Sequence, residues 1–147
     1  MAYLTNADIE QRLGHLVYVQ LTDDAGTGAA NEALVSEARL GSEGEVDSYV
    51  GRRCVVRVDL GAHPELAGVL KSVTLDLAEY RLHARRAIAP AEVKAKRDAA
   101  LRWLERIAAG EVVLPAASTP EPNPAAAFMG QAVGTDRTLT RDEMEDL

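Results

Sequence analysis

The stretch PELAGVLKSVTLDLAEYRLH, residues 64–83, carries the clearest helical pattern of this 147-residue chain. Its apolar residues recur at helical spacing over about four turns, at Leu66, Val69, Leu70, Val73, Leu77 and Tyr80. Pro64 suits the first turn of a helix, where its missing N–H would have no partner. Leu75, Ala78 and Leu82 form a second apolar flank. Because this helix is apolar on more than one side, we expect it at the centre of a bundle, packed by several neighbours.

Another helix is predicted near the N-terminus, where two start signals coincide. Thr5 and Asp8 have the spacing of a capping box, in which each side chain bonds the backbone N–H of the other. Leu4 and Ile9 stand at the two positions of a hydrophobic staple around the same start. Gly14 interrupts this helix. We expect the apolar residues that follow, at 16–19 and 21, to form a short buried segment whose type the pattern leaves open.

Two longer helices are predicted on either side of the central one. The first covers residues 30–53 and combines an apolar face with an acidic outer face. Gly41 and Gly44 each cost it about 1 kcal/mol relative to Ala, which is explained if another helix crosses closely there or if the helix kinks. The last helix follows Pro90, ends at Gly110 and displays basic residues opposite its apolar stripe. Trp103 lies off that stripe and is expected to be a half-exposed anchor.

The remaining segments differ in composition from the helices. Residues 54–58 are rich in β-branched side chains and predict a short extended piece, for which residues 112–114 are the candidate pairing partner. Prolines at 115, 120, 122 and 124 exclude a helix and indicate an extended linker. We therefore predict a mainly α fold, with a bundle of about four helices in residues 1–115. A linker and a C-terminal docking tail follow in residues 116–147.

Charge is distributed unevenly along the chain. The net charge is −7, which argues against general affinity for nucleic-acid phosphate. Residues 1–50 carry 2 basic and 9 acidic groups, residues 51–110 carry 12 and 7, and residues 111–147 carry 2 and 7. Either these charges balance within one folded subunit, or they give neighbouring copies complementary faces.

The sequence shows no pattern that predicts an enzyme, a cofactor or a metal site. The histidines at 15, 63 and 83 lack the spacing of metal ligands. The loop at residues 22–28 lacks the later oxygen ligands of a calcium loop and the motif of a phosphate-binding loop. Cys54 is the single cysteine, which excludes an internal disulfide and fits a reducing compartment. No apolar run reaches the length of a membrane helix, so we expect a non-catalytic protein with no membrane partner.

Four short stretches carry a resemblance to a known family. They are Tyr3-Leu4-Thr5 before a capped helix, Val46-Asp47-Ser48-Tyr49-Val50 leading to Arg52-Arg53, Tyr80-Arg81-Leu82, and Ala100-Leu101-Arg102-Trp103-Leu104 with Gly110 after it. With these marks, residues 1–115 resemble small proteins encoded among the structural genes of Mu-like phages and prophages, which look like head-tail connectors. The family follows its arginine with an aromatic residue and a proline, whereas this chain has Cys54 and Arg57.

The resemblance implies a helical subunit of a ring, expected to be dodecameric, at the outer end of the portal. DNA would pass through this ring as cargo, and the partners would be further copies, the portal protein and a neighbouring neck or tail protein. The expected location is the virion neck, with the host cytoplasm during assembly. The charge split supplies two unlike faces for contacts between identical subunits, at Glu37, Glu43, Glu45, Asp47, Arg81, Arg85, Arg86, Lys94, Lys96 and Arg97. Docking onto the portal or a neighbour is expected at Phe128, Met129, Met144 and Leu147.

Two other functions stay open on the sequence alone. A small helical DNA-binding regulator would use the basic cluster near the start of the last helix, although the overall charge and the acidic tail weigh against it. Another phage neck protein, such as a head stopper or a tail terminator, would share the features of a connector.

Overall fold

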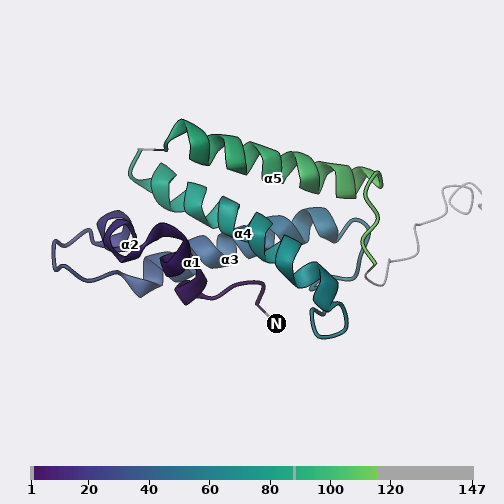
Figure 1. Ribbon diagram of the computed structural model, residues 1–147, viewed down its shortest axis with the longest axis horizontal. Helices are drawn as coiled ribbons and strands as arrows, with labels where there is room; N and C mark the ends of the chain where they lie inside the picture. The colour runs from purple at the N-terminus through teal and green to yellow at the C-terminus, as the bar shows by residue number, and fades with distance from the viewer. Residues whose placement is uncertain (1, 88, 116–147) are drawn as a thin grey trace, which may run out of the picture.

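The computed structural model describes residues 2–87 and 89–115, which form five helices and no sheet (Figure 1). They are α1 (Asn6–Leu13), α2 (His15–Thr22), α3 (Glu32–Val50), α4 (Pro64–Arg85) and α5 (Ala91–Ala109). Helices α3, α4 and α5 lie side by side, with α1 and α2 at one end (Figure 1). Helix α4 contacts each of the other four. The mainly α fold and the central place of the 64–83 pattern are therefore confirmed.

The fifth helix is α2, the apolar segment whose type the sequence left open. The capping box before α1 forms as predicted: the Thr5 N–H donates to Asp8 Oδ2 at 2.8 Å, and the Asp8 N–H to Thr5 Oγ1 at 3.3 Å. Gly14, at φ 78°, ends α1 and starts α2. Because α2 is a short helix with one face on the core, Tyr18 is buried whereas Leu16 is 81% exposed. The prediction that Leu16 is buried was wrong.

Helix α3 begins at its Asn31 cap, whose side-chain oxygen accepts from the N–H groups of Ala33 and Leu34. It ends at Val50, three residues before the predicted end. The close approach expected at its glycines comes from a side chain instead of a helix backbone. A Cβ at Gly41 would lie 2.9 Å from Arg81 Nη1, whereas a Cβ at Gly44 would meet nothing within 4 Å.

Residues 54–58 and 112–114 do not form the two-stranded ribbon that their composition suggested; there is no sheet in the described ranges. Cys54, Val58 and Leu114 instead insert separately into the core. The adjacent Arg53 caps α5, donating to the carbonyls of Ala108 at 3.2 Å and Ala109 at 3.1 Å. Helix ends need such partners for their last carbonyl groups.

Two hydrophobic cores share α3 and α4. The bundle core lies among α3, α4, α5 and the segments beside them and includes Val46, Val50, Leu70, Leu77, Leu104 and Ile107. The N-terminal core lies under α1 and α2 and consists of Leu4, Ile9, Tyr18, Leu21, Val35, Ala78 and Leu82. No helix in the described ranges is long and apolar enough to cross a membrane.

Candidate interaction surfaces

Most of the basic residues predicted to face a neighbouring subunit form ion pairs within their own chain. The pairs are Arg81–Glu45 at 2.8 Å, Arg85–Asp24 at 2.6 Å, Arg86–Asp24 at 2.9 Å, Lys96–Glu79 at 3.7 Å and Arg97–Asp98 at 3.1 Å. Arg97 also lies over the ring of Tyr80, 4.6 Å from its centroid. Of the six, only Lys94 has no ion pair among the described residues. The charge split seen in the sequence is thus largely balanced inside one subunit.

Arg85 and Arg86, at the end of α4, hold the loop that follows α2. Arg85 donates to both carboxylate oxygens of Asp24, at 2.6 and 2.9 Å, and to the Leu21 carbonyl at 2.6 Å. Arg86 donates to the Asp23 carbonyl at 2.8 Å. The hydrogen bond from Arg85 lowers the pKa of Asp24 below its ordinary value. These two arginines therefore serve the fold of their own subunit.

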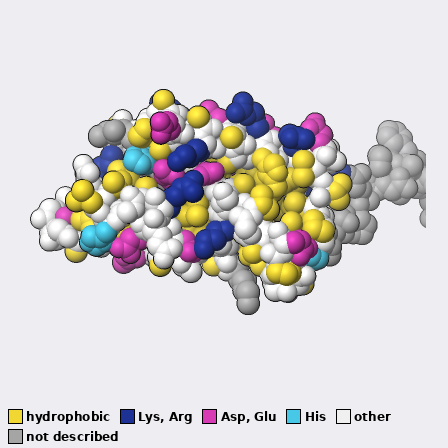
Figure 2. Space-filling model, in the orientation of Figure 1, with side chains coloured by type: hydrophobic (Ala, Val, Ile, Leu, Met, Phe, Trp, Pro, Cys, Tyr) yellow, Lys and Arg dark blue, Asp and Glu magenta, His cyan; other side chains and the backbone are white. Residues whose placement is uncertain are grey.

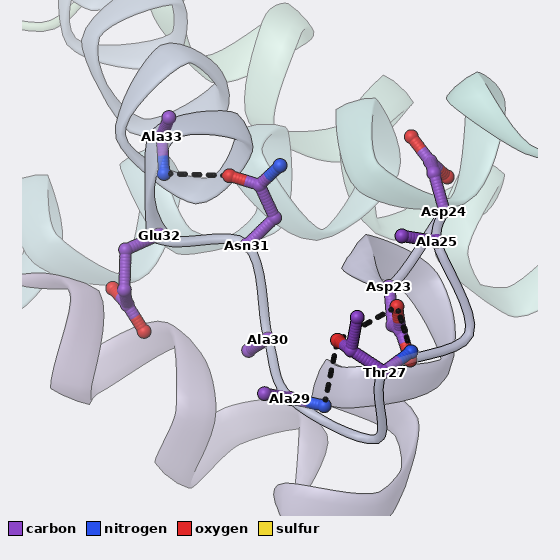
Figure 3. Close-up of a pocket in the computed structure, with 9 residues that line it drawn as sticks. All are labelled: Asp23, Asp24, Ala25, Thr27, Ala29, Ala30, Asn31, Glu32 and Ala33. Atoms are coloured by element: carbon purple, nitrogen blue, oxygen red, sulfur yellow. Dashed lines mark hydrogen bonds between the residues drawn. The ribbon is translucent and has the colours of Figure 1, made fainter.

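The loop itself borders an open hollow of about 530 Å³ next to the start of α3 (Figure 3). Four alanines line it, together with polar residues that include Asp23, Asp24 and Glu32. Asp23 is used by the turn, since it accepts from the N–H groups of Thr27 at 3.0 Å and Gly28 at 2.6 Å. These bonds lower the pKa of Asp23. Across the described part of the chain, no group of three or more His, Cys, Asp or Glu side chains is placed to hold a metal ion.

Glu43, predicted to face a neighbouring subunit, is fully buried inside its own chain. Its Oε1 accepts from Tyr3 N–H at 3.1 Å and from Arg39 Nη1 at 3.3 Å. Arg57 Nη2 lies 3.6 Å from Oε2, which has no hydrogen bond. A buried carboxylate is stable only with such partners, so Glu43 anchors the N-terminal segment and is not exposed to another subunit.

Asp47 belongs to the same buried network. The Tyr3 hydroxyl donates to it at 2.6 Å and accepts the Val58 N–H at 3.2 Å, while Arg57 Nε lies 3.3 Å from its other oxygen. Burial and the bond to Asp47 raise the pKa of Tyr3. Several marks of the family resemblance thus have structural roles: Tyr3 and Asp47 join here, and a Cβ at Gly110 would lie 3.0 Å from the capping side chain of Arg53.

Two helix faces carry exposed groups that could meet another molecule, and of their residues sequence reasoning had singled out Glu37 as an interface residue and Trp103 as an anchor. The outer stripe of α5 contains Ala99, Arg102, Trp103 and Arg106, of which only Trp103 is half-buried. Trp103 packs partly on the bundle core and is half-buried, as predicted, whereas its role as an anchor stays a prediction. Figure 2 shows hydrophobic side chains gathered over the seam between α4 and α5, with basic side chains along the α5 edge.

The outer stripe of α3 contains Glu37, Leu40, Gly44 and Ser48, all exposed. Leu40 is 54% exposed and places an apolar side chain on this acidic face. Helical periodicity places the members of each stripe on one face, but a single sequence does not show which charges are paired, so it could not separate these residues from the other charged ones. The predicted docking residues Phe128, Met129, Met144 and Leu147 lie outside the described residues.

Comparison with known protein families identifies the family of this chain. The family described as Bacteriophage Mu, Gp36 matches residues 3–132, which is most of the chain. A search of curated proteins found no match. The resemblance to proteins of Mu-like phages is thereby confirmed at the level of the family. The chain belongs to the bacteriophage Mu Gp36 family.

Proposed function

We propose that this chain is a non-catalytic structural subunit of the phage neck, which assembles with copies of itself into a ring between portal and tail. The ring is expected to be dodecameric and to let DNA pass as cargo. Membership of a Mu phage protein family supports a role in the phage. The compact helical bundle, whose N-terminal segment is tied to α3 through Glu43, supports a subunit of fixed shape.

The ion pairs that the basic cluster forms within its own chain favour a connector over a DNA-binding regulator. DNA binding depends on cations that neutralise phosphates and release counterions. Here Arg81, Arg85 and Arg86 already pair with carboxylates of their own chain. A surface with its charges balanced in this way binds a passing duplex only weakly. Weak binding suits a channel subunit and does not suit a regulator.

Location in the virion tests this function directly. Gold-labelled antibodies against the chain should bind at the head–tail junction of purified particles seen by electron microscopy. Phages lacking the gene should accumulate DNA-filled heads without attached tails. Label along the tail, or normal virions without the gene, would contradict the proposal, and a label on the tail side of the junction would favour a stopper or terminator.

The DNA-binding alternative has its own test. The purified chain should pass through a DNA column at physiological ionic strength, because its net charge is −7 and its basic cluster is paired. Retention that falls steeply with added salt would favour the regulator.

The tail, residues 116–147, is proposed to dock onto the portal or a neighbouring neck protein through Phe128, Met129, Met144 and Leu147. A chain ending at Pro115 should keep its melting temperature, since both hydrophobic cores lie before that residue, yet fail to attach to portal-bearing heads. A matched full-length variant with serine at the four docking positions should fail in the same way. Normal attachment of either protein would leave the helical bundle as the docking surface.

A further inference from the structure

The outer stripe of α5 carries two arginines with few partners in their own chain, beside an aromatic side chain. Ala99, Arg102, Trp103 and Arg106 follow the i, i+3, i+4, i+7 spacing that places residues on one helix face. Arg102 is exposed and has no ion pair among the described residues. Arg106 has only an exposed partner, Glu111 at 3.2 Å. Exposed pairs of this kind contribute little and exchange readily, so both guanidinium groups are available to an external carboxylate.

The outer stripe of α3 complements that of α5, because it carries an acidic side chain, an exposed apolar side chain and a glycine. Glu37 is exposed and forms no hydrogen bond or ion pair in the part of the chain that the structure describes. One turn further on, Leu40 exposes an apolar side chain, and another turn on, Gly44 leaves open space. A glycine inside a helix is unfavourable relative to alanine, and none of the described residues approaches Gly44 closely enough to require one.

The two stripes point toward different sides of the molecule. Trp103 lies on the flank of α5 that also carries Lys96, whose ammonium meets Glu79 together with Arg12 of α1. The outer stripe of α3 is opposite Val35, Val46 and Val50, which α3 buries in the two cores. A contact between two different faces of identical subunits propagates in one direction and closes into a ring when the rotation allows.

We propose that copies of this chain associate head to tail, the α5 stripe of one copy packing on the α3 stripe of the next. Trp103 of one copy covers Leu40 and fills the space over Gly44, while Arg102 pairs with Glu37. A large aromatic side chain opposite a glycine lets two helices pack closely, and the charge pair fixes which faces meet. This inference rests on the proposed function and deepens it, because it names the two faces, and the residues on them, through which neighbouring copies join.

Self-association of the full chain in solution provides the test. Sedimentation velocity over a concentration series should show the wild type forming oligomers. Arg102→Glu and Glu37→Arg should each lower the association constant at least about tenfold, because each places like charges opposite one another. The double variant should regain association close to the wild type, since every contact then carries a reversed pair. Trp103 is the only tryptophan, so its emission should shift to the blue as oligomers form.

Lys94→Glu is the matched control. Lys94 is exposed on the same helix, and it lies nine residues before Trp103, which places it on the opposite side of α5. The same charge change there should leave association unchanged. A wild type that stays monomeric up to about 1 mM, single variants that associate like the wild type, a double variant without recovery, or constant emission would each overturn the inference. Because this experiment needs no virion, its result is independent of where the protein lies in the particle.

Discussion

The bundle core and the N-terminal core are built differently, although α3 and α4 run through both. The bundle core contains 13 buried residues from three long helices and the segments around them. The N-terminal core contains seven, and ion pairs also hold its helices. Arg12 of α1 meets Asp76 at 2.5 Å and Glu79 at 3.3 Å, and Asp8 meets Lys71 at 2.6 Å. The bundle is thus stabilised mainly by apolar burial, and the N-terminal helices by burial together with charge.

This difference predicts an order of stability within one fold. Short helices with few buried contacts open more easily than long packed ones, and each of α1 and α2 has eight residues. Hydrogen exchange should therefore be faster in α1 and α2 than in the middle of α4. Changes to the bundle core should unfold the whole chain, whereas changes to the polar contacts should act first at the N-terminal end.

The largest effect is expected from Leu77→Ala in the bundle core. Leu77 is 1% exposed, and truncation of such a leucine removes buried area and leaves a cavity. The free energy of unfolding should fall by about 2–5 kcal/mol, as measured by urea denaturation. Leu40→Ala is the control, because Leu40 is 54% exposed and should lose no more than about 0.5 kcal/mol. A loss below about 1 kcal/mol at Leu77 would show that α4 is not the centre of the core.

A smaller effect is expected from Tyr3→Phe, which tests the buried polar network. The lost hydroxyl leaves Asp47 without its 2.6 Å donor and the Val58 N–H without an acceptor. The expected cost is about 1.5–3 kcal/mol, typical of a hydrogen bond to a charged group. Tyr49→Phe provides the comparison, since no hydrogen bond joins the Tyr49 hydroxyl to the described residues. Equal losses in the two variants would mean that the network adds nothing to stability.

Sequence periodicity predicted the elements whose stability is local or strongly amphipathic. The capping box at Thr5, the Pro64 start, the apolar stripe of α4 and the Gly110 end are all confirmed. The nature of α2 was not predictable, because a short apolar run fits a strand or a helix equally well. The ribbon at residues 54–58 was predicted from β-branched composition, yet only Cys54 and Val58 enter the bundle core and Val55 and Val56 are exposed, which is decided by tertiary packing.

The interface was less predictable than the fold. Counting charges along the chain identified acidic and basic regions, but several of these charges meet each other in the folded chain, as Arg81 meets Glu45 and Arg85 meets Asp24. Partners such as Arg81 and Glu45, which are 36 positions apart, have no signal in a single sequence. The burial of Glu43 likewise depends on the N-terminal segment folding back over α3.

The two glycines of α3 offer a comparison with a smaller effect. Gly44→Ala should raise the free energy of unfolding by about 0.5–1 kcal/mol, because a Cβ there meets nothing within 4 Å and alanine is the better helix former. Gly41→Ala should gain less or lose stability, since its Cβ would lie only 2.9 Å from Arg81 Nη1. The guanidinium would have to move, which would disturb the Arg81–Glu45 pair. Thermal unfolding of both variants at a concentration where the chain is monomeric decides this. Equal gains would mean that the Arg81 side chain moves aside without cost.

The smallest effect concerns acid, and it tests whether charge holds the N-terminal helices. The hydrogen bond from Lys71 lowers the pKa of Asp8 below its ordinary value of 3.8. A carboxylate with a lowered pKa in the folded state stabilises the fold at pH values above its unfolded pKa, and this contribution disappears as the pH falls through the folded value. Below about pH 4 the wild type should therefore lose stability that Asp8→Asn has already lost, and the difference between their free energies of unfolding should disappear.

At neutral pH this gap in the free energy of unfolding should be below about 1 kcal/mol, because the Asp8–Lys71 pair is partly exposed. Urea denaturation of both proteins from pH 7 to pH 2 measures it, with Asp98→Asn as the control because Asp98 is exposed and pairs only with its neighbour Arg97. A gap that stays constant over this range would show that Asp8 contributes through its capping bond to Thr5 and not through its charge.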